Sequence, residues 1–121
     1  ATIRFANAGH NPALLLHADG STEELASTGM PLGLMPAAEY SSRELEMRPG
    51  DLLVLYTDGI VEAIDPDEQE FDLQRLQEHC RRHASEPLTA LAEALQRELD
   101  AFVQGVPFAD DRTLVMLRRA P

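Results

Sequence analysis

Two aspartates at the edges of apolar runs are the residues of this chain best suited to chemistry. Residues 52–56 form an apolar run that ends in Thr57-Asp58-Gly59, and Asp110-Asp111 precede a second run at residues 113–118. Carboxylate oxygens are the ligands that Mg²⁺ and Mn²⁺ prefer in proteins. An isolated Asp-Gly pair is usually a turn after a strand. Two such strand ends side by side, however, predict a site for a divalent cation.

The strand at residues 52–56 must position Asp58. Its side chains do not alternate between apolar and polar, which predicts a strand covered on both faces, as in a sheet held between a second sheet and a layer of helices. Pro49-Gly50 fits a turn that fixes where this strand begins. We expect Gly59 to let the backbone turn close beside Asp58, because glycine has no Cβ.

The chain before this strand reads as further strands. Residues 2–8 and 12–17 predict two strands joined in a hairpin by Gly9-His10-Asn11. Asp19-Gly20 marks a tight turn, and weaker strand patterns follow at residues 21–25 and 40–47. A glycine- and proline-punctuated loop separates these last two patterns.

Two helices are predicted between Asp58 and Asp110. Asp72 is placed to cap the first helix, in which Leu73, Leu76 and Cys80 share one stripe. The second, residues 88–102, follows Pro87 and carries a longer apolar stripe typical of core packing. The order of strands, two helices and a final strand predicts a single α+β domain over residues 1–121, with helices on one side of an antiparallel sheet.

Composition excludes several classes of protein. The chain has 121 residues, a net charge of −11 and no Lys, so we exclude nucleic acid as a partner, because its phosphates would be repelled. No apolar stretch approaches the roughly 20 residues that cross a bilayer, and we see no signal-like segment. We therefore expect a cytoplasmic protein without a membrane partner. The single Cys80 rules out an internal disulfide and a cysteine-based zinc site.

Several motifs occur together in a recognisable order. Over nearly the whole chain, they resemble the SpoIIE/RsbU-like branch of the type 2C metal-dependent serine/threonine phosphatases. The motifs are Asn7-Ala8-Gly9-His10-Asn11-Pro12, Gly29-Met30-Pro31-Leu32-Gly33, Pro49-Gly50-Asp51, Tyr56-Thr57-Asp58-Gly59-Ile60-Val61-Glu62-Ala63 and Asp110-Asp111-Arg112-Thr113. In that family the fold is a sandwich of two antiparallel sheets flanked by helices, with a two-metal centre at one edge.

The resemblance implies a role for each site residue. Asp58, Gly59 and Asp110 would form the site for Mg²⁺ or Mn²⁺, with the two aspartates as ligands, and Asp111 matches a neighbouring, secondary position. His10 is a further secondary candidate near the active edge, although we favour the interpretation of a hairpin histidine held by local hydrogen bonds. The implied reaction is metal-dependent hydrolysis of phosphoserine or phosphothreonine. The implied partners are a phosphorylated anti-sigma-factor antagonist and an upstream sensor or receiver domain.

The chain departs from the family in one large respect and one small one. The first half of the family's domain contains an aspartate that bridges both metals, and nothing in this chain matches it, so we expect the C-terminal portion of the domain. Sheet edges left unpaired in this way favour a homodimer. Phe71-Asp72 also stands where the family often has Phe-Gly.

Two other functions compete with an active phosphatase. The first is a catalytically inactive phosphatase-like module that binds a regulatory partner. The second is an aspartyl-phosphate phosphatase of the haloacid dehalogenase type, which we disfavour because Tyr56 occupies the position where that class has its nucleophilic aspartate.

Overall fold

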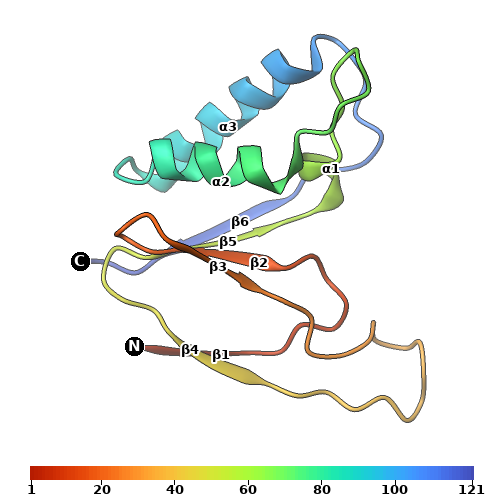
Figure 1. Cartoon of the computed structure of the whole chain (residues 1–121), viewed down its shortest axis with the longest axis vertical. Coiled ribbons are helices and arrows are strands. Elements are labelled where there is room, and N and C mark those ends of the chain that lie inside the picture. Colours follow the sequence, from red (N-terminus) through yellow and green to blue (C-terminus); the bar gives the residue numbers. More distant parts are fainter.

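Two antiparallel sheets and a layer of helices make up the fold. A computed structural model describes residues 1–121. Its elements in chain order are β1 (Thr2–Phe5), β2 (Ala13–Leu16), β3 (Thr22–Leu25), β4 (Arg43–Glu46), β5 (Leu52–Tyr56), α1 (Asp58–Val61), α2 (Asp72–Arg82), α3 (Leu88–Val103) and β6 (Leu114–Arg118). The helices cover one face of the larger sheet, and the smaller sheet lies beyond the other face (Figure 1). None of the helices is long and apolar enough to cross a membrane.

The larger sheet has the strand order β3-β2-β5-β6, and all its neighbours are antiparallel. The smaller sheet contains only β1 and β4. This arrangement confirms the predicted α+β sandwich flanked by helices. In the larger sheet β5 pairs with β6 from Leu52↔Arg118 to Tyr56↔Leu114, so the end of β5 lies beside the start of β6.

Strand β5 is covered on both faces, as its lack of polar alternation predicts. Leu52, Val54 and Tyr56 are buried in the larger core, which lies between the sheet and the helices. On the opposite face Leu53 packs against a smaller cluster between the two sheets, formed by Leu15, Leu25 and Met47. Burial on both sides fixes the register of β5 and hence the position of the residues that follow it.

The apolar stripes of both long helices face the core, as predicted. Leu91, Leu95 and Leu99 of α3 are buried, as are Leu76 and Cys80 of α2. Burial raises the pKa of the Cys80 thiol to about 12, which keeps it protonated and unreactive.

Helix α2 begins at Asp72, but the predicted cap is wrong. Asp72 has a left-handed backbone (φ 68°). Its carboxylate accepts a hydrogen bond from the adjacent Leu73 amide at 2.7 Å, and no side chain caps the helix. Glycine would adopt this left-handed conformation without the steric cost that a side chain brings.

The predicted hairpin at Gly9-His10-Asn11 is also wrong. Strand β1 pairs with β4, through Ile3↔Leu45, whereas β2 pairs with β3 and β5. The segment between β1 and β2 therefore crosses from one sheet to the other. Strand β1 ends at Phe5, earlier than expected. The two strands lie in different sheets because their burial differs. Alternate residues of β1 are exposed, which suits a small peripheral sheet, whereas three of the four residues of β2 are buried inside the larger sheet.

A buried ion pair lies at the opposite end of β5 from Asp58. The carboxylate of Asp51 is fully buried and accepts hydrogen bonds from the amides of Arg48 and Ala18 and from Nδ1 of His17, at 2.8, 3.0 and 2.9 Å. Nε2 of His17 lies 2.9 Å from Oε2 of Glu23. The hydrogen bond to Asp51 is the main cause that raises the pKa of His17. These contacts tie the start of β5 to the β2–β3 turn.

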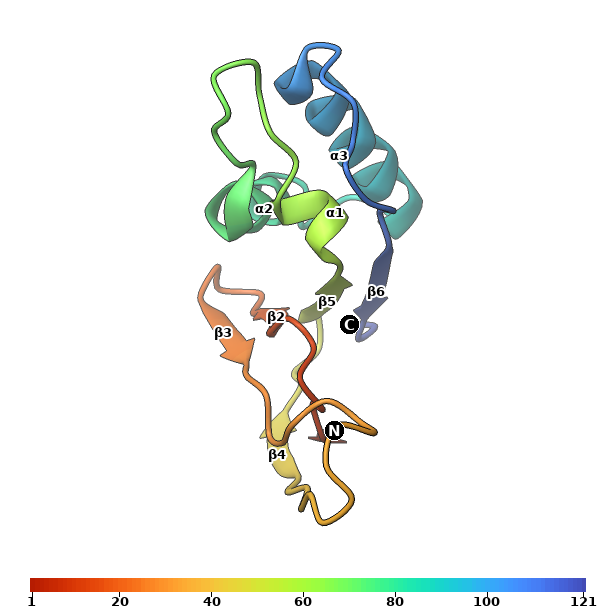
Figure 2. The ribbon, with the colours of Figure 1, turned by 90° about the vertical axis from the view of Figure 1, so that its right-hand side faces the viewer.

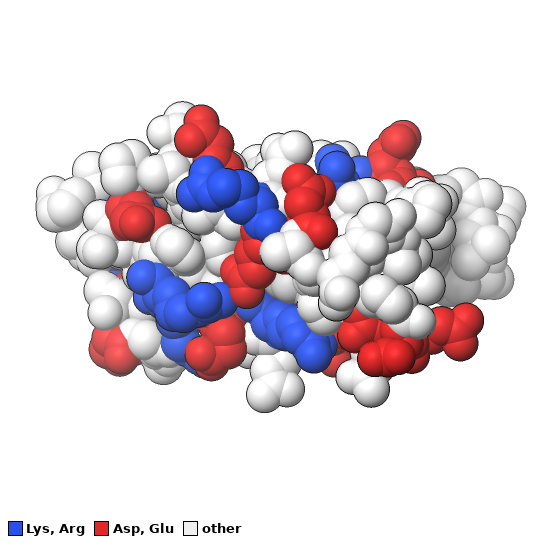
Figure 3. Space-filling model, turned by 90° about the horizontal axis from the view of Figure 1, so that it is seen from above, with Lys and Arg blue, Asp and Glu red and all other residues white.

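Charges of both signs are interspersed over the helical layer. Figure 3, which views the molecule from the helical side, shows arginines lying between acidic side chains. Ion pairs in this layer join Arg81 to Glu78 at 2.6 Å and Arg82 to Glu98 at 2.8 Å. The few basic residues are thus distributed among the more numerous acidic ones.

Candidate metal centre

The pairing of β5 with β6 brings the two predicted metal ligands to one end of the sheet. Asp58 begins α1 directly after β5, and Asp110 lies in the loop that leads into β6. Both line an open cavity of about 240 Å³. The other residues that line it are Gly9, His10, Asn11 and Thr57. Asp58, Asp110 and His10, which are far apart in sequence, therefore face a single small space.

Asn11 holds the carboxylate of Asp58. Its Nδ2 donates a hydrogen bond to Oδ1 of Asp58 at 2.6 Å. Asn11 comes from the segment that crosses between the sheets, so this contact depends on the crossing that replaced the predicted hairpin. Within the motif Asn7 to Pro12, sequence reasoning singled out His10 and gave Asn11 no role in the site. The only feature of the sequence that could have indicated this role is that Asn11 carries a side-chain amide in the same short motif as His10.

Thr57 fastens the end of β5 to the loop that carries Asp110. Its amide donates to the carbonyl oxygen of Thr113 at 3.2 Å, and its Oγ1 accepts from the Thr113 amide at 3.0 Å. The same Oγ1 donates to the carbonyl oxygen of Asp111 at 3.3 Å. The carboxylate of Asp110 accepts a hydrogen bond from the Asp111 amide at 2.8 Å. Both candidate ligands are thus oriented by neighbouring groups, which favours ion binding because less freedom is lost.

Gly59 has a different role from the one expected. It lies inside α1 and is buried, and its φ is not positive, so it does not supply a special turn. A Cβ at this position would lie 2.0 Å from the carbonyl oxygen of Asp111 and 3.1 Å from that of Asp110. Glycine is therefore needed because the loop with Asp110 passes against the backbone of α1.

The two secondary candidates occupy different places. His10 lines the cavity, and its contacts are local: its Nδ1 donates to the carbonyl oxygen of Asn11 at 3.0 Å, and its amide donates to Oδ1 of Asn7 at 2.8 Å. Asp111 is not among the residues that line this cavity. It faces a neighbouring open depression with Asp110 and Arg112.

The cavity lies in a negative electrostatic field. The pKa of Glu62, at the end of α1, is raised chiefly by the charge of Asp58, with smaller contributions from desolvation, Glu70 and Asp110. A cation between these carboxylates would relieve their repulsion. Hard oxygen donors of this kind suit Mg²⁺ or Mn²⁺. No group of three or more His, Cys, Asp and Glu side chains is arranged to bind a metal. Asp58 and Asp110 would therefore need further ligands to complete a coordination shell.

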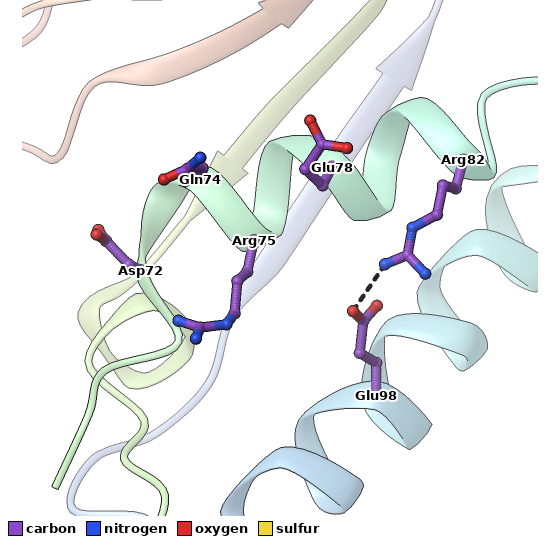
Figure 4. Close-up of a pocket in the computed structure, with 6 residues that line it drawn as sticks. All are labelled: Asp72, Gln74, Arg75, Glu78, Arg82 and Glu98. Atoms are coloured by element: carbon purple, nitrogen blue, oxygen red, sulfur yellow. Dashed lines mark hydrogen bonds and ion pairs between the residues drawn. The ribbon is translucent and has the colours of Figure 1, made fainter.

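A larger cavity, of about 400 Å³, lies between α2 and α3, away from these carboxylates (Figure 4). It is lined by Asp72, Gln74, Arg75, Glu78, Arg82 and Glu98. Its arginines are already engaged: Arg82 pairs with Glu98 at 2.8 Å, and Arg75 donates to the carbonyl oxygens of Glu70 and Phe71. We assign it no chemistry.

Comparison with known proteins identifies the family. The sequence profile described as Stage II sporulation protein E (SpoIIE) matches residues 1–120. Protein IcfG from Synechocystis is 32% identical over 117 residues, which cover 97% of this chain and 18% of IcfG. The phosphoserine phosphatase RsbU of Bacillus subtilis is 29% identical over 119 residues, which cover 95% of this chain and 34% of RsbU.

Solved structures agree on the fold. The SiaA-PP2C domain of Pseudomonas aeruginosa superposes with a TM-score of 0.83 at 27% identity, over 97% of this chain and 46% of that one. A structure of the RsbU and RsbW domains of Rv1364c from Mycobacterium tuberculosis superposes with a TM-score of 0.75 at 30% identity. The match covers 99% of this chain and 33% of that one. The chain therefore spans less than half the length of each of these four proteins. It belongs to the SpoIIE family, in the SpoIIE/RsbU-like branch of the type 2C phosphatases that its motifs resemble.

Proposed function

We propose that this chain forms the metal-binding C-terminal portion of a Mg²⁺- or Mn²⁺-dependent protein serine/threonine phosphatase, with Asp58 and Asp110 as metal ligands. One observation carries the proposal: both carboxylates line a single cavity where β5 ends and β6 begins. The description of RsbU as a phosphoserine phosphatase supports the reaction.

The residues of the chain would act by holding the ligands in place. Asn11 orients Asp58, the Asp111 amide orients Asp110, and Thr57 keeps their two segments together. Bound divalent metals would supply a water of lowered pKa and neutralise charge on the phosphoryl oxygens. This chemistry requires no Ser, Cys or His nucleophile, and the buried, protonated Cys80 is consistent with that.

We further propose a phosphorylated regulatory protein of the anti-sigma-factor-antagonist class as substrate. Two findings support this class: the similarity to RsbU, and the similarity to a protein that carries RsbU and RsbW domains in one structure. The second candidate function is a non-catalytic module that binds such a protein. It is favoured by the ligand count, because Asp58 and Asp110 are too few to hold two metals and no group of three or more His, Cys, Asp and Glu side chains is arranged to bind one.

Titration of the chain with Mn²⁺, followed by calorimetry, tests the metal ligands. We expect Asp58→Ala and Asp110→Ala each to weaken binding by at least about tenfold, because each removes a charged ligand. Asp67→Ala is the matched control: it removes the same charge from an exposed position outside the cavity and should leave binding unchanged. Binding that survives both Asp58→Ala and Asp110→Ala would disprove the assignment.

Turnover of p-nitrophenyl phosphate and of a phosphoserine protein separates the two candidate functions. We expect little activity from the chain by itself, because two metals about 3.5–4 Å apart need more ligands than Asp58 and Asp110 supply. The native protein that carries this chain should be active and should lose activity on Asp58→Ala. A native protein that binds the phosphoprotein without metal-dependent turnover would support the non-catalytic module instead.

A further inference from the structure

The loop between β3 and β4 presents an unusual concentration of exposed apolar side chains. Residues 29–36, hereafter the apolar loop, contain four of the seven large exposed hydrophobic residues of the chain. Their exposed fractions are 42% for Met30, 79% for Leu32, 60% for Leu34 and 53% for Met35. Scattered apolar residues are normal on a protein surface, but a cluster of this kind indicates a contact surface.

The apolar loop has a defined structure. Its turns are closed by hydrogen bonds from the Leu34 amide to the Pro31 carbonyl at 3.3 Å and from the Ala38 amide to the Met35 carbonyl at 3.2 Å. At its base Gly29 packs against the ring of Tyr40, where a Cβ would lie only 2.5 Å from a ring carbon. A surface held in one conformation loses less entropy when a partner binds.

The apolar loop adjoins the candidate metal centre. Pro31 packs directly on Gly9, where a Cβ would lie 2.6 Å from the proline ring, and Gly9 lines the same cavity as Asp58. An isolated bridge pairs Ala8 with Gly29. Figure 2, which faces the end of the sheet where α1 begins, shows the apolar loop on that same side of the molecule. A folded protein with a side chain in the cavity would therefore extend over the apolar loop.

Charge favours this loop as the place where a phosphorylated protein is held. The chain has a net charge of −11, so most of its surface repels a phosphate-bearing partner. Residues 25–38 carry no charged side chain. Apolar contact is a source of affinity that this charge does not oppose, and the apolar loop is the exposed apolar surface that adjoins the cavity.

We propose, on the basis of the proposed phosphatase function, that the apolar loop is a docking surface for the folded phosphoprotein substrate. Leu32, Leu34 and the two methionines bury themselves against an apolar patch beside the phosphorylated residue. The loop contributes to binding of the protein and takes no part in hydrolysis. Small phosphate esters, which reach the cavity without touching the loop, gain nothing from it.

The test compares three substrates of the native protein: p-nitrophenyl phosphate, a short phosphoserine peptide and a folded phosphoserine protein of the anti-sigma-factor-antagonist class. In the double variant Leu32→Ser/Leu34→Ser we expect kcat/KM for the folded protein to fall about tenfold or more, mainly through KM. The other two substrates should change by less than about twofold. The conservative variant Leu32→Met/Leu34→Met, which keeps both side chains apolar, should retain normal kinetics.

Three results would overturn the docking role. They are unchanged kinetics on the folded protein, an equal loss on all three substrates, and a change of oligomeric state in gel filtration, which would make the loop a contact between copies of the chain. The Asp58→Ala variant distinguishes failure of the docking role from failure of the proposed phosphatase function. If p-nitrophenyl phosphate turnover is absent or survives Asp58→Ala, the phosphatase assignment itself fails, and the docking role fails with it.

Discussion

Replacing Gly59 by alanine should separate the two halves of the candidate metal centre. The added Cβ would lie 2.0 Å from the carbonyl oxygen of Asp111, whereas real Cβ atoms essentially never come within 3.0 Å of such an atom. Helix α1 and the loop with Asp110 must therefore move apart by about 1 Å. Such overpacking costs about 1–3 kcal/mol. The hydrogen bond from Thr57 to Asp111, which resists the movement, adds about 1 kcal/mol when it is lost.

Urea denaturation and Mn²⁺ calorimetry of the same variant measure both consequences. We expect Gly59→Ala to lower the free energy of unfolding by about 2–4 kcal/mol. We also expect Mn²⁺ affinity to fall about tenfold, as when the supporting groups of a metal ligand are lost. Thr57→Val, which removes the hydroxyl from the same contact, should have a smaller effect in the same direction.

Gly20→Ala controls for a general loss of stability. Gly20 has a φ of 90°, and no atom lies within 4 Å of the position that a Cβ would occupy, so its replacement introduces backbone strain of about 1–2 kcal/mol without a clash. It should destabilise the chain while Mn²⁺ affinity stays normal. If Gly59→Ala costs less than about 0.5 kcal/mol and leaves Mn²⁺ binding unchanged, the close approach of the two segments is refuted.

Two further predictions concern stability away from the site. Asp72→Gly should be more stable than Asp72→Ala by about 1 kcal/mol in urea denaturation, because both lose the carboxylate and only glycine adopts the φ of 68° without strain; equal stabilities would contradict this. The raised pKa of His17 means that its ion pairs with Asp51 and Glu23 stabilise the fold fully below its ordinary pKa of 6.5, and that this stabilisation is lost as pH rises through the folded-state pKa. The excess stability of the native chain over His17→Gln should therefore shrink as pH rises above about 6.5, and a difference that stays constant on both sides of this pH would contradict the role of His17.

Elements whose burial is uniform could be predicted from the sequence. The stripe with Leu91, Leu95 and Leu99 has one environment along its length, so its period identifies both the helix and its buried face. Strand β5 is similar, because an unbroken apolar run has no face to expose. In both cases the local pattern and the final environment agree.

Pairing between distant segments could not be predicted in the same way. Strands of four residues are too short to specify a partner, and β1 joined β4 instead of its neighbour β2. The contact between Asn11 and Asp58 joins residues 47 positions apart and depends on that pairing. The cavity that Asp58 and Asp110 line was predictable only because Asp58 follows one apolar strand, Asp110 precedes another, and those strands are neighbours.

The hydrogen bonds between Thr57 and Thr113 also have a consequence for how the chain folds. They join residues 56 positions apart, and all three helices lie between them. Closing a loop of this length costs about 3–4 kcal/mol of chain entropy, and long-range pairings of this kind form slowly compared with local helices. During synthesis α2 and α3 can form before β6 exists, whereas Asp58 meets Asp110 only after β6 has left the ribosome and paired with β5. An incomplete nascent chain would therefore present helices but no paired carboxylates.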